Sequence, residues 1–437
     1  MATMTRENVQ AIMSSHDPTS SVLEGHDLSG LDLTGLTFDG WNLTRTKFDD
    51  CRLMGVHFID AILYHAEFQG AHLQGADLSQ AWARKACFRE AKLNGAVLLG
   101  LQAMGADFSL ADMSPDHRQQ PVGAASANFQ LANFAGADLT DLQAPDANLQ
   151  RAQLVPDPRT GRKVVAHRAK LIGAQLARIE VRDADLTGVH LDYSTGHNAC
   201  FSNVTMLDSS ARNASWLGAI LIKIIAPHSD WSGAEMKKSD MLEIDLSGST
   251  LVGCRFDESS WGKVLLCSAD LTDAHMENMG IMEGDATMAD LSGIQAPGLR
   301  IQGTPDTPFL FDRVRLSGAN LTGATLTRVA CIRANMSSMT APRMRMEGGV
   351  FFESRLQNSD LRRAEMTGVK LYRPHWEMFT VAEALQGTRL DGAIGFPPLR
   401  PPVGSCANDA LPAWLQRLIR SRHMTSGVYR KLTTLQP

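Results

Sequence analysis

Residues 26–55 read HDLSG LDLTG LTFDG WNLTR TKFDD CRLMG, with a large apolar residue at the centre of every group of five. Leu28, Leu33 and Phe38 are the first three of these centres. An α-helix repeats its buried face about every 3.6 residues and a β-strand about every 2, so a period of five fits neither. The stretch therefore predicts a repeat architecture in which each five-residue unit sends one side chain into a shared core.

The five-residue register covers most of the chain. It runs without a slip from 21 to 115, resumes shifted by one residue over 127–156, and continues over 169–373. In the third block only Gly196 and Asp306, of 41 centres, are not apolar. The first position of each unit is small in most units, most often Ala or Ser. A pattern of this length predicts one solenoid rather than several globular domains.

The units resemble those of the pentapeptide-repeat family, whose consensus is A(D/N)LXX. The closest matches are ADLSQ at 76–80, ADLTD at 137–141, ADLTG at 184–188 and ANLTG at 319–323. The resemblance covers about residues 21–393 and implies an all-β solenoid, a right-handed quadrilateral β-helix in which four units form one 20-residue coil. Centres and first positions would point inward, so Leu246 is expected in the core and the next residue, Ser247, in solvent.

Spacings of 20 residues support this coil length independently. Glycines at the fifth position recur every 20 residues, as a column of corners with positive φ requires, at Gly35, Gly55, Gly75 and Gly95. Charges of alternating sign also recur every 20 residues, at Lys223, Glu243, Lys263 and Glu283, and opposite charges on neighbouring strands stabilise a sheet. By the same count Arg255, Arg315 and Arg355 are expected in one column. Stacked continuously, the repeats predict about 16 coils and a rod of roughly 80 Å.

Three regions follow from these patterns. Residues 1–20 form a leader with a short capping helix that begins after Thr5, and residues 21–396 form the solenoid, with insertions at 116–126 and 157–168. Residues 397–437 form a proline-rich linker and an amphipathic C-terminal helix. The stripe of that helix contains Leu411, Trp414, Leu415, Leu418 and Ile419. Two roles stay open for it: it caps the last coil, or it docks on a partner.

Two further groups of residues are candidates for contact with a partner. The insertion 157–168 carries Arg159, Arg162, Lys163 and Arg168, and it is either a plain surface loop or a basic contact loop. The fourth, outward position of one column holds Ile222, Leu242 and Met282. Apolar side chains clustered on the outside of a protein often mark a contact site.

The composition restricts the functional class. The 47 acidic and 42 basic residues leave a net charge of −5, which argues against a strongly basic nucleic-acid binder. The seven cysteines form no CxxC pair, and the N-terminus has no apolar region typical of a cleaved signal peptide. The longest apolar run, 217–226, is too short to span a bilayer. We therefore expect a cytoplasmic protein without a membrane span.

The sequence contains no motif that predicts catalysis. A P-loop, HExxH and GxSxG are absent, and the histidines are scattered. Asp230, Asp270 and Asp290 share a column, but polar second positions belong to the repeat itself. We predict no enzymatic activity, no cofactor and no metal site.

The function that fits is a non-enzymatic bacterial scaffold that binds a protein partner. The leader MTRENVQAIMSSHD (4–17), followed by DLSGLDLTG (27–35), resembles pentapeptide proteins encoded beside type VI secretion components. That resemblance implies a role in loading or delivering an effector. The alternative, also implied by the family, is a DNA mimic that binds a topoisomerase and protects it from inhibitors. That role requires a dense negative surface, because duplex DNA carries one charge per about 1.7 Å of axis, and this chain is only mildly acidic. The oligomeric state stays open.

Overall fold

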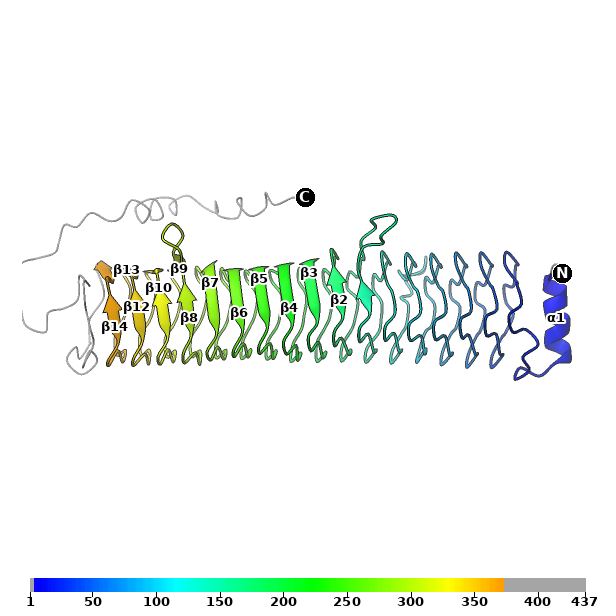
Figure 1. Cartoon of the computed structure of the whole chain (residues 1–437), viewed down its shortest axis with the longest axis horizontal. Coiled ribbons are helices and arrows are strands. Elements are labelled where there is room, and N and C mark those ends of the chain that lie inside the picture. Colours follow the sequence, from blue (N-terminus) through cyan, green and yellow to red (C-terminus); the bar gives the residue numbers. More distant parts are fainter. Residues whose placement is uncertain (1–3, 373–437) are drawn as a thin grey trace, which may run out of the picture.

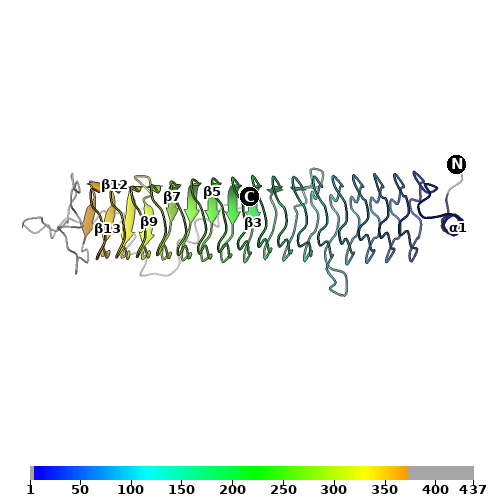
Figure 2. The same cartoon turned by 90° about the horizontal axis from the view of Figure 1, so that it is seen from below.

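The computed structural model describes residues 4–372, which form one straight rod with helix α1 (Arg6–Ser15) at its N-terminal end (Figure 1). The rod has the same elongated outline when it is turned by 90° (Figure 2). Parallel pairing connects second positions without interruption from Asp27 and Lys47 in the first coils to Arg345 and Glu365 in the last. The three repeat blocks therefore form a single continuous stack, a right-handed quadrilateral β-helix.

The second position of the repeat stabilises the turn that follows it. The Asp27 side chain accepts a hydrogen bond from the amide of Ser29 at 3.0 Å, and Asp77 accepts one from Ser79 at 2.9 Å. Asp and Asn bond their own backbone two residues on in this way, which explains their frequency at this position.

The fifth position is a corner with positive φ in nearly every unit. Gly35 has φ +75°, but Arg45 and Asp50 occupy the same conformation at +58° and +54°. Among the non-glycine residues with positive φ in the described part of the chain, none is Val, Ile or Thr. β-Branched side chains fit this region of φ/ψ space worst, so the corner selects residue types although it does not require glycine.

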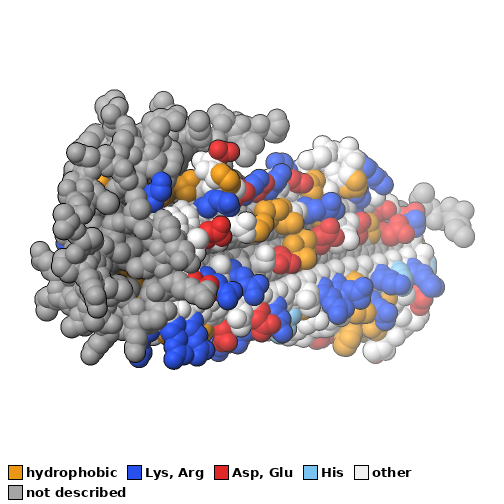
Figure 3. Space-filling view, turned by 60° about the vertical axis from the view of Figure 1, so that its left-hand side comes forward, with side chains coloured by type: hydrophobic (Ala, Val, Ile, Leu, Met, Phe, Trp, Pro, Cys, Tyr) orange, Lys and Arg blue, Asp and Glu red, His pale blue; other side chains and the backbone are white. Residues whose placement is uncertain are grey.

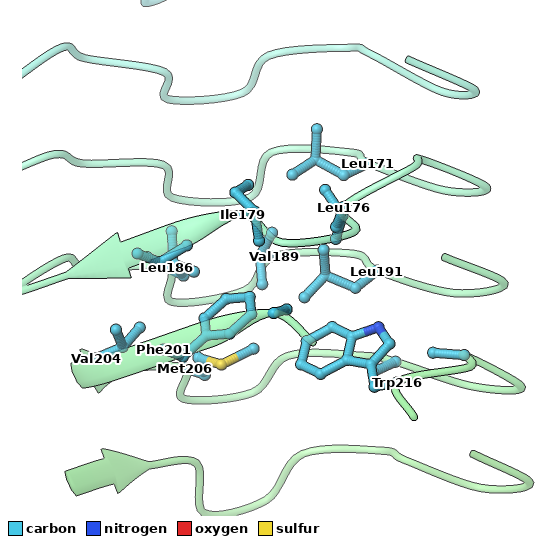
Figure 4. Packing of buried hydrophobic residues seen from close by; sticks show 14 of the residues in the cluster. Leu171, Leu176, Ile179, Leu186, Val189, Leu191, Phe201, Val204, Met206 and Trp216 are labelled. Carbon is cyan, nitrogen blue, oxygen red and sulfur yellow. The ribbon is translucent and has the colours of Figure 1, made fainter. Parts of the chain in front are cut away.

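The centres and first positions fill the core. Aromatic centres one coil apart stack face to face: the ring centroids of Phe68 and Phe88 are 5.0 Å apart, and those of Phe88 and Phe108 are 4.8 Å apart. Figure 4 shows side chains from successive coils, among them Leu186, Phe201 and Trp216, packed together inside the solenoid. The core is consequently one side chain wide per face and is continuous along the rod.

Most polar side chains at first positions donate a hydrogen bond to a backbone carbonyl of the preceding coil. The buried hydroxyls of Thr46 and Ser229 donate to the carbonyls of Leu23 and Met206, each at 2.8 Å. Ser, Thr and Cys can therefore replace Ala at this position, because most of them donate to a carbonyl that lies 23 residues earlier, whereas Ser239 donates to the carbonyl of Met236 in its own coil.

Helix α1 covers the first coil. The Thr5 side chain and Asn8 form a reciprocal capping box, and Val9 is buried against the core. The guanidinium of Arg6 donates to the carbonyls of Asp32 and Thr34, at 2.7 and 2.9 Å. The open end of the stack is closed by these contacts, as a solenoid requires.

The insertions are shorter than the sequence predicts. Pairing jumps from Val97 to Gly123 and from Asp138 to Val165, so the extra residues number six and seven rather than eleven and twelve. Residues 122–126 and 164–168 are ordinary units of the solenoid, with Ala124 and Ala166 as small centres. A third insertion, 304–308, preserves the five-residue register. The sequence predicts only a bulged side here, because Asp306 falls at a centre between Pro305 and Pro308, but the pairing shows five extra residues.

This third insertion corrects one predicted column. Asp290 pairs with Arg315, whereas Arg255 lies in the column of His275, Gln295 and Asn320. Arg315 and Arg355 do share a column, but Arg255 lies on a different face. The prediction was wrong because it counted residues 304–308 as one side of a coil.

Ser247 also differs from the prediction. Leu246 is buried as expected, but Ser247 is buried as well. The Ser247 carbonyl accepts a hydrogen bond from the amide of His228, which fixes its place relative to the preceding coil. Ser247 therefore lies between Pro227 and Cys267, two larger residues one coil away on either side. A small side chain at an outward position can therefore be covered by its neighbours along the rod.

Regular strands occur in the second half of the rod, whereas the coils before residue 153 pair through isolated bridges. The strands are β1 (Gln153–Leu154), β2 (Glu180–Arg182), β3 (Cys200–Thr205), β4 (Ile220–Ile225), β5 (Asp240–Asp245), β6 (Ser260–Leu265), β7 (Gly280–Asp285), β8 (Arg300–Gln302), β9 (Phe309–Asp312), β10 (Thr325–Thr327), β11 (Val329–Ile332), β12 (Arg345–Glu347), β13 (Val350–Phe352), β14 (Glu365–Thr367) and β15 (Lys370–Tyr372). All pair in parallel. Within residues 4–372, no helix has the length and apolar character needed to cross a membrane.

Candidate interaction surface

The longest strands, β3 to β7, carry the main outward-facing group of apolar side chains. The register places Ile222 beside Leu242, Leu242 beside Gly262, and Gly262 beside Met282, so the column expected from the sequence is present. Leu242 and Met282 are 44% and 61% exposed, whereas Ile222 is only partly exposed. A Cβ added to Gly262 would lie 2.9 Å from the Leu242 side chain, so Leu242 leans over the glycine and fills the gap in the column.

Two isoleucines that the sequence reasoning left out of the candidate set extend this group. Ile220 and Ile225, the ends of β4, are 41% and 50% exposed. Both are second-position residues, where the repeat favours polar side chains, and that departure is the signal that would have identified them. We call Ile220, Ile222, Ile225, Leu242 and Met282 the β4–β7 patch. Figure 3 shows apolar side chains lying among acidic and basic ones along the described part of the rod.

A row of alternating charges passes through the β4–β7 patch. Lys223, Glu243, Lys263 and Glu283 are the fifth-position corners of β4 to β7, each with positive φ. The Lys263 ammonium lies 3.3 Å from a carboxylate oxygen of Glu243. Exposed pairs of this kind contribute less than about 1 kcal/mol each to stability. Their main effect is to give the patch a charge pattern of both signs.

The predicted basic loop is divided by the structure. Arg159, Arg162 and Lys163 are exposed in the insertion 157–163, whereas Arg168 is the corner of the following solenoid unit. The Arg168 guanidinium makes two hydrogen bonds to the Asp141 carboxylate, at 2.8 and 2.7 Å, which raise the pKa of Arg168. Arg168 is thus paired within the rod, and three cations remain on the loop.

The loop is held at its base by a buried carboxylate. Asp157 accepts hydrogen bonds from the backbone amides of Arg159 and Thr160, at 3.0 and 2.8 Å, and lies 3.6 Å from the guanidinium of Arg89. Burial alone would raise the pKa of Asp157, but these hydrogen bonds and the Arg89 charge together hold the pKa below its usual value. The base of the loop is therefore fixed on the solenoid, and its cations are presented to solvent.

The acidic column has a structural role. Asp230, Asp270 and Asp290 each accept the amide two residues ahead, from Ser232, Thr272 and Ser292. Asp290 also lies 3.0 Å from the Arg315 guanidinium. Within the described residues, no three His, Cys, Asp or Glu side chains gather in a geometry that could hold a metal ion.

The buried cysteines are not activated. Burial raises the pKa of Cys51 to about 11 and that of Cys254 to about 12, and it raises the pKa of Cys331 as well. Because the thiolate is the nucleophile, a raised pKa makes these thiols inert at neutral pH. Their side chains pack in the core as small first-position or centre residues.

The remaining candidates, Trp414, Leu415, Leu418 and Ile419, lie outside the described residues, as do the linker and the helix predicted for 397–437.

A sequence profile described as pentapeptide repeats matches the chain in eight copies within residues 51–89 and 311–338. None of the curated proteins matches the chain.

Several solved structures resemble the chain. HetL, a pentapeptide repeat protein involved in heterocyst differentiation regulation from the cyanobacterium Nostoc sp., is 22% identical over 57% of this chain and 96% of its own, with a TM-score of 0.25. A pentapeptide repeat protein from the Arabidopsis thaliana thylakoid lumen is 30% identical over 30% of this chain and 77% of its own, with a TM-score of 0.17. QnrB1, a plasmid-mediated fluoroquinolone resistance protein, is 19% identical over 44% of this chain and 79% of its own, with a TM-score of 0.17. The repeat register and the parallel pairing of successive coils define the fold of this chain.

Proposed function

The chain belongs to the pentapeptide repeat family, and from that premise we propose that it is a non-enzymatic scaffold that binds a protein partner through the β4–β7 patch. The observation that carries this proposal is the exposure of Ile220, Ile225, Leu242 and Met282, at 41–61%, on neighbouring parallel strands. Parallel sheets are normally covered on both faces, so an uncovered apolar group on one is a surface available for contact.

The surroundings of the patch suit a protein rather than a nucleic acid. Its corner row contains two lysines and two glutamates, and a phosphate backbone would be repelled by the glutamates. Protein interfaces combine an apolar centre with a polar rim of both signs, and the patch has this composition. The exposed cations Arg159, Arg162 and Lys163 on the upstream loop provide a second, basic contact for the same kind of partner.

Binding can be tested by paired variants in the source cell. Tagged wild-type protein and the double variant Leu242→Glu/Met282→Glu are used to recover partners, and each recovered protein is purified and tested for direct binding. Met288→Glu is the matched control, because Met288 is 54% exposed but lies at a corner outside the patch. We expect direct binding to survive in the control and to fall at least about tenfold in the double variant, since two buried charges replace apolar contacts. Equal binding by all three proteins would refute the patch as the contact site.

Mimicry of duplex DNA is the competing function. The stretch 183–299 is strongly acidic, with 17 acidic against 6 basic residues, which gives −11 over about six coils. Several of these carboxylates are paired, as in the 3.0 Å contact between Asp290 and Arg315. A mimic would recover a topoisomerase and would be displaced from it by duplex DNA, whereas our proposal predicts a contact that DNA does not displace. Recovery of secretion-machine subunits would instead support the link suggested by the leader.

A further inference from the structure

Outward-facing side chains in the last coils are buried, which is unlike the same columns earlier in the rod. In β11 and β13, the second and fourth positions alternate with inward centres and so point outward. Ala330, Ile332, Val350 and Phe352 occupy these positions and are only 0–8% exposed. Ile225, in the second-position column of this face, is 50% exposed. Something therefore covers this face of the last coils.

The four side chains form one apolar group. Ala330 pairs with Val350, and Ile332 pairs with Phe352. The columns continue to Leu310 and to the fully buried Asp312, whose carboxylate lies 3.6 Å from the guanidinium groups of Arg313 and Arg333. We call Leu310, Ala330, Ile332, Val350 and Phe352 the lateral patch.

The adjacent insertion does not account for this burial. Loop 304–308 reads TPDTP, projects beside β9 (Figure 1), and has Asp306 exposed. Five residues without a large apolar side chain cannot cover Phe352, which lies two coils further along the rod than Phe309 and Asp312. The cover must come from another segment of the same chain.

We propose that residues 411–419 of this chain pack on the lateral patch. The chain continues for 65 residues beyond Tyr372, and Tyr372 itself pairs with Phe352, so this segment begins one coil from the patch. Residues 373–396 belong to the predicted solenoid, and the 14 residues from 397 to 410 would span about 20 Å as a flexible linker. Two coil spacings cover about 10 Å, so the linker reaches the patch easily.

The chemistry of residues 411–419 matches the patch. Leu411, Trp414, Leu415, Leu418 and Ile419 form an apolar stripe with helical spacing. As a helix, nine residues extend over about 13 Å, close to the length of three stacked coils at strand spacing. The patch offers β-branched and aromatic side chains of complementary character. This segment would then lie along the side of the rod rather than over its last coil, and it would occupy a surface distinct from the β4–β7 patch.

Hydroxyl-radical footprinting of the full chain tests this assignment, with oxidation at Phe352 as the readout. The variants are Leu415→Glu/Leu418→Glu and Trp414→Ala, which disrupt the stripe, and the matched control is Gln416→Glu, which adds a charge away from the stripe. Met282, already 61% exposed, is the internal standard for an intact rod.

We expect oxidation of Phe352 to rise roughly sixfold in the stripe variants, the ratio of the exposed fractions of Ile225 and Phe352, 50% and 8%. Oxidation of Met282 should stay constant, and the control should behave as the wild type. If Phe352 stays protected in both stripe variants, or is already as reactive as Met282 in the wild type, the proposal is overturned. Because no partner is present in this assay, its outcome is independent of the proposed function.

Discussion

Replacing Phe88 with alanine tests whether stacked centres carry the stability of the rod. Phe88 is buried between Phe68 and Phe108, with ring centroids 5.0 and 4.8 Å away and nearly parallel ring planes. The substitution removes the ring from the middle of this column.

The expected cost follows from burial and stacking. Truncation of a buried Phe to Ala costs about 3–5 kcal/mol, and the spread depends on how far the site collapses. The backbone around Phe88 is held by ladder bonds to both neighbouring coils, such as the one from its amide to the carbonyl of Asp107 at 2.6 Å, so collapse is restricted. We therefore expect a cost in the upper half of that range. Phe88→Leu should cost less than about 1.5 kcal/mol, since Leu is the commonest centre elsewhere in the rod.

Denaturant unfolding, followed by far-ultraviolet circular dichroism, measures both variants against the wild type. A repeat rod responds locally, so Phe88→Ala should also broaden or split the transition as the coils near residue 88 unfold before the rest. Phe88→Leu should shift the midpoint slightly and keep the shape. If the two variants unfold within about 0.5 kcal/mol of each other, the stacked centres do not carry the stability and the reasoning fails.

Three other outcomes follow from the structure. Asp157→Ala should destabilise the base of loop 157–163 by about 1–3 kcal/mol and speed tryptic cleavage at Arg159, Arg162 and Lys163, while Asp116→Ala, in an exposed turn, should leave that cleavage unchanged. Burial raises the pKa to about 11 for Cys51 and to about 12 for Cys254, so these thiols ionise at lower pH in the unfolded chain than in the folded one. The free energy of unfolding should therefore fall as pH rises from about 9 towards 12, and the fall should be smaller in the variant Cys51→Ser/Cys254→Ser. Leu246→Asp should prevent folding or lower the melting temperature sharply, because it places an unpaired charge in the core; a melting temperature equal to that of the wild type would show that Leu246 does not face inward.

The period of the sequence was sufficient to predict the coil, the core and the corners. A residue at every fifth position must face inward if the unit is one side of a square, and Leu28, Leu33 and Phe38 are all buried. The 20-residue coil followed from Gly35 and Gly55 and from Lys223 and Glu243, because these types have a physical reason to stack. The helix after Thr5 was predicted from its capping residues, which form the expected bonds.

The insertions were harder to predict for two reasons. A unit with a small residue at its centre is not recognised as a repeat, and an insertion of five residues does not shift the five-residue register. Units 122–126 and 164–168 have alanine at their centres, so the sequence pattern did not identify them as repeats. The predicted insertions therefore included these units and were each five residues too long. Residues 304–308 shift every later column by one side without shifting the register, which misplaced Arg255 relative to Arg315.

The sequence predicted exposed apolar residues only where they recur at one outward position of the repeat, 20 residues apart. Ile222, Leu242 and Met282 are all at one position of the repeat, so they were visible in the sequence. The lateral patch was missed because its residues occupy two positions and follow the third insertion. Ser247 is buried because its neighbours one coil away are larger. The repeat pattern assigns each position separately and does not take the size of these neighbours into account.

The continuity of the rod is tested most directly by a distance measured across the first two insertions. Spin labels carried by noncanonical amino acids at Glu67 and Asp240 lie in one column, separated by eight successive pairings through residues 87, 107, 133, 153, 180, 200 and 220. At about 4.8 Å per coil, pulsed dipolar spectroscopy should give a single narrow distribution centred near 38 Å. A distance below about 25 Å, or a broad distribution, would mean that the repeat blocks fold back on one another or move independently, and would contradict a single continuous solenoid.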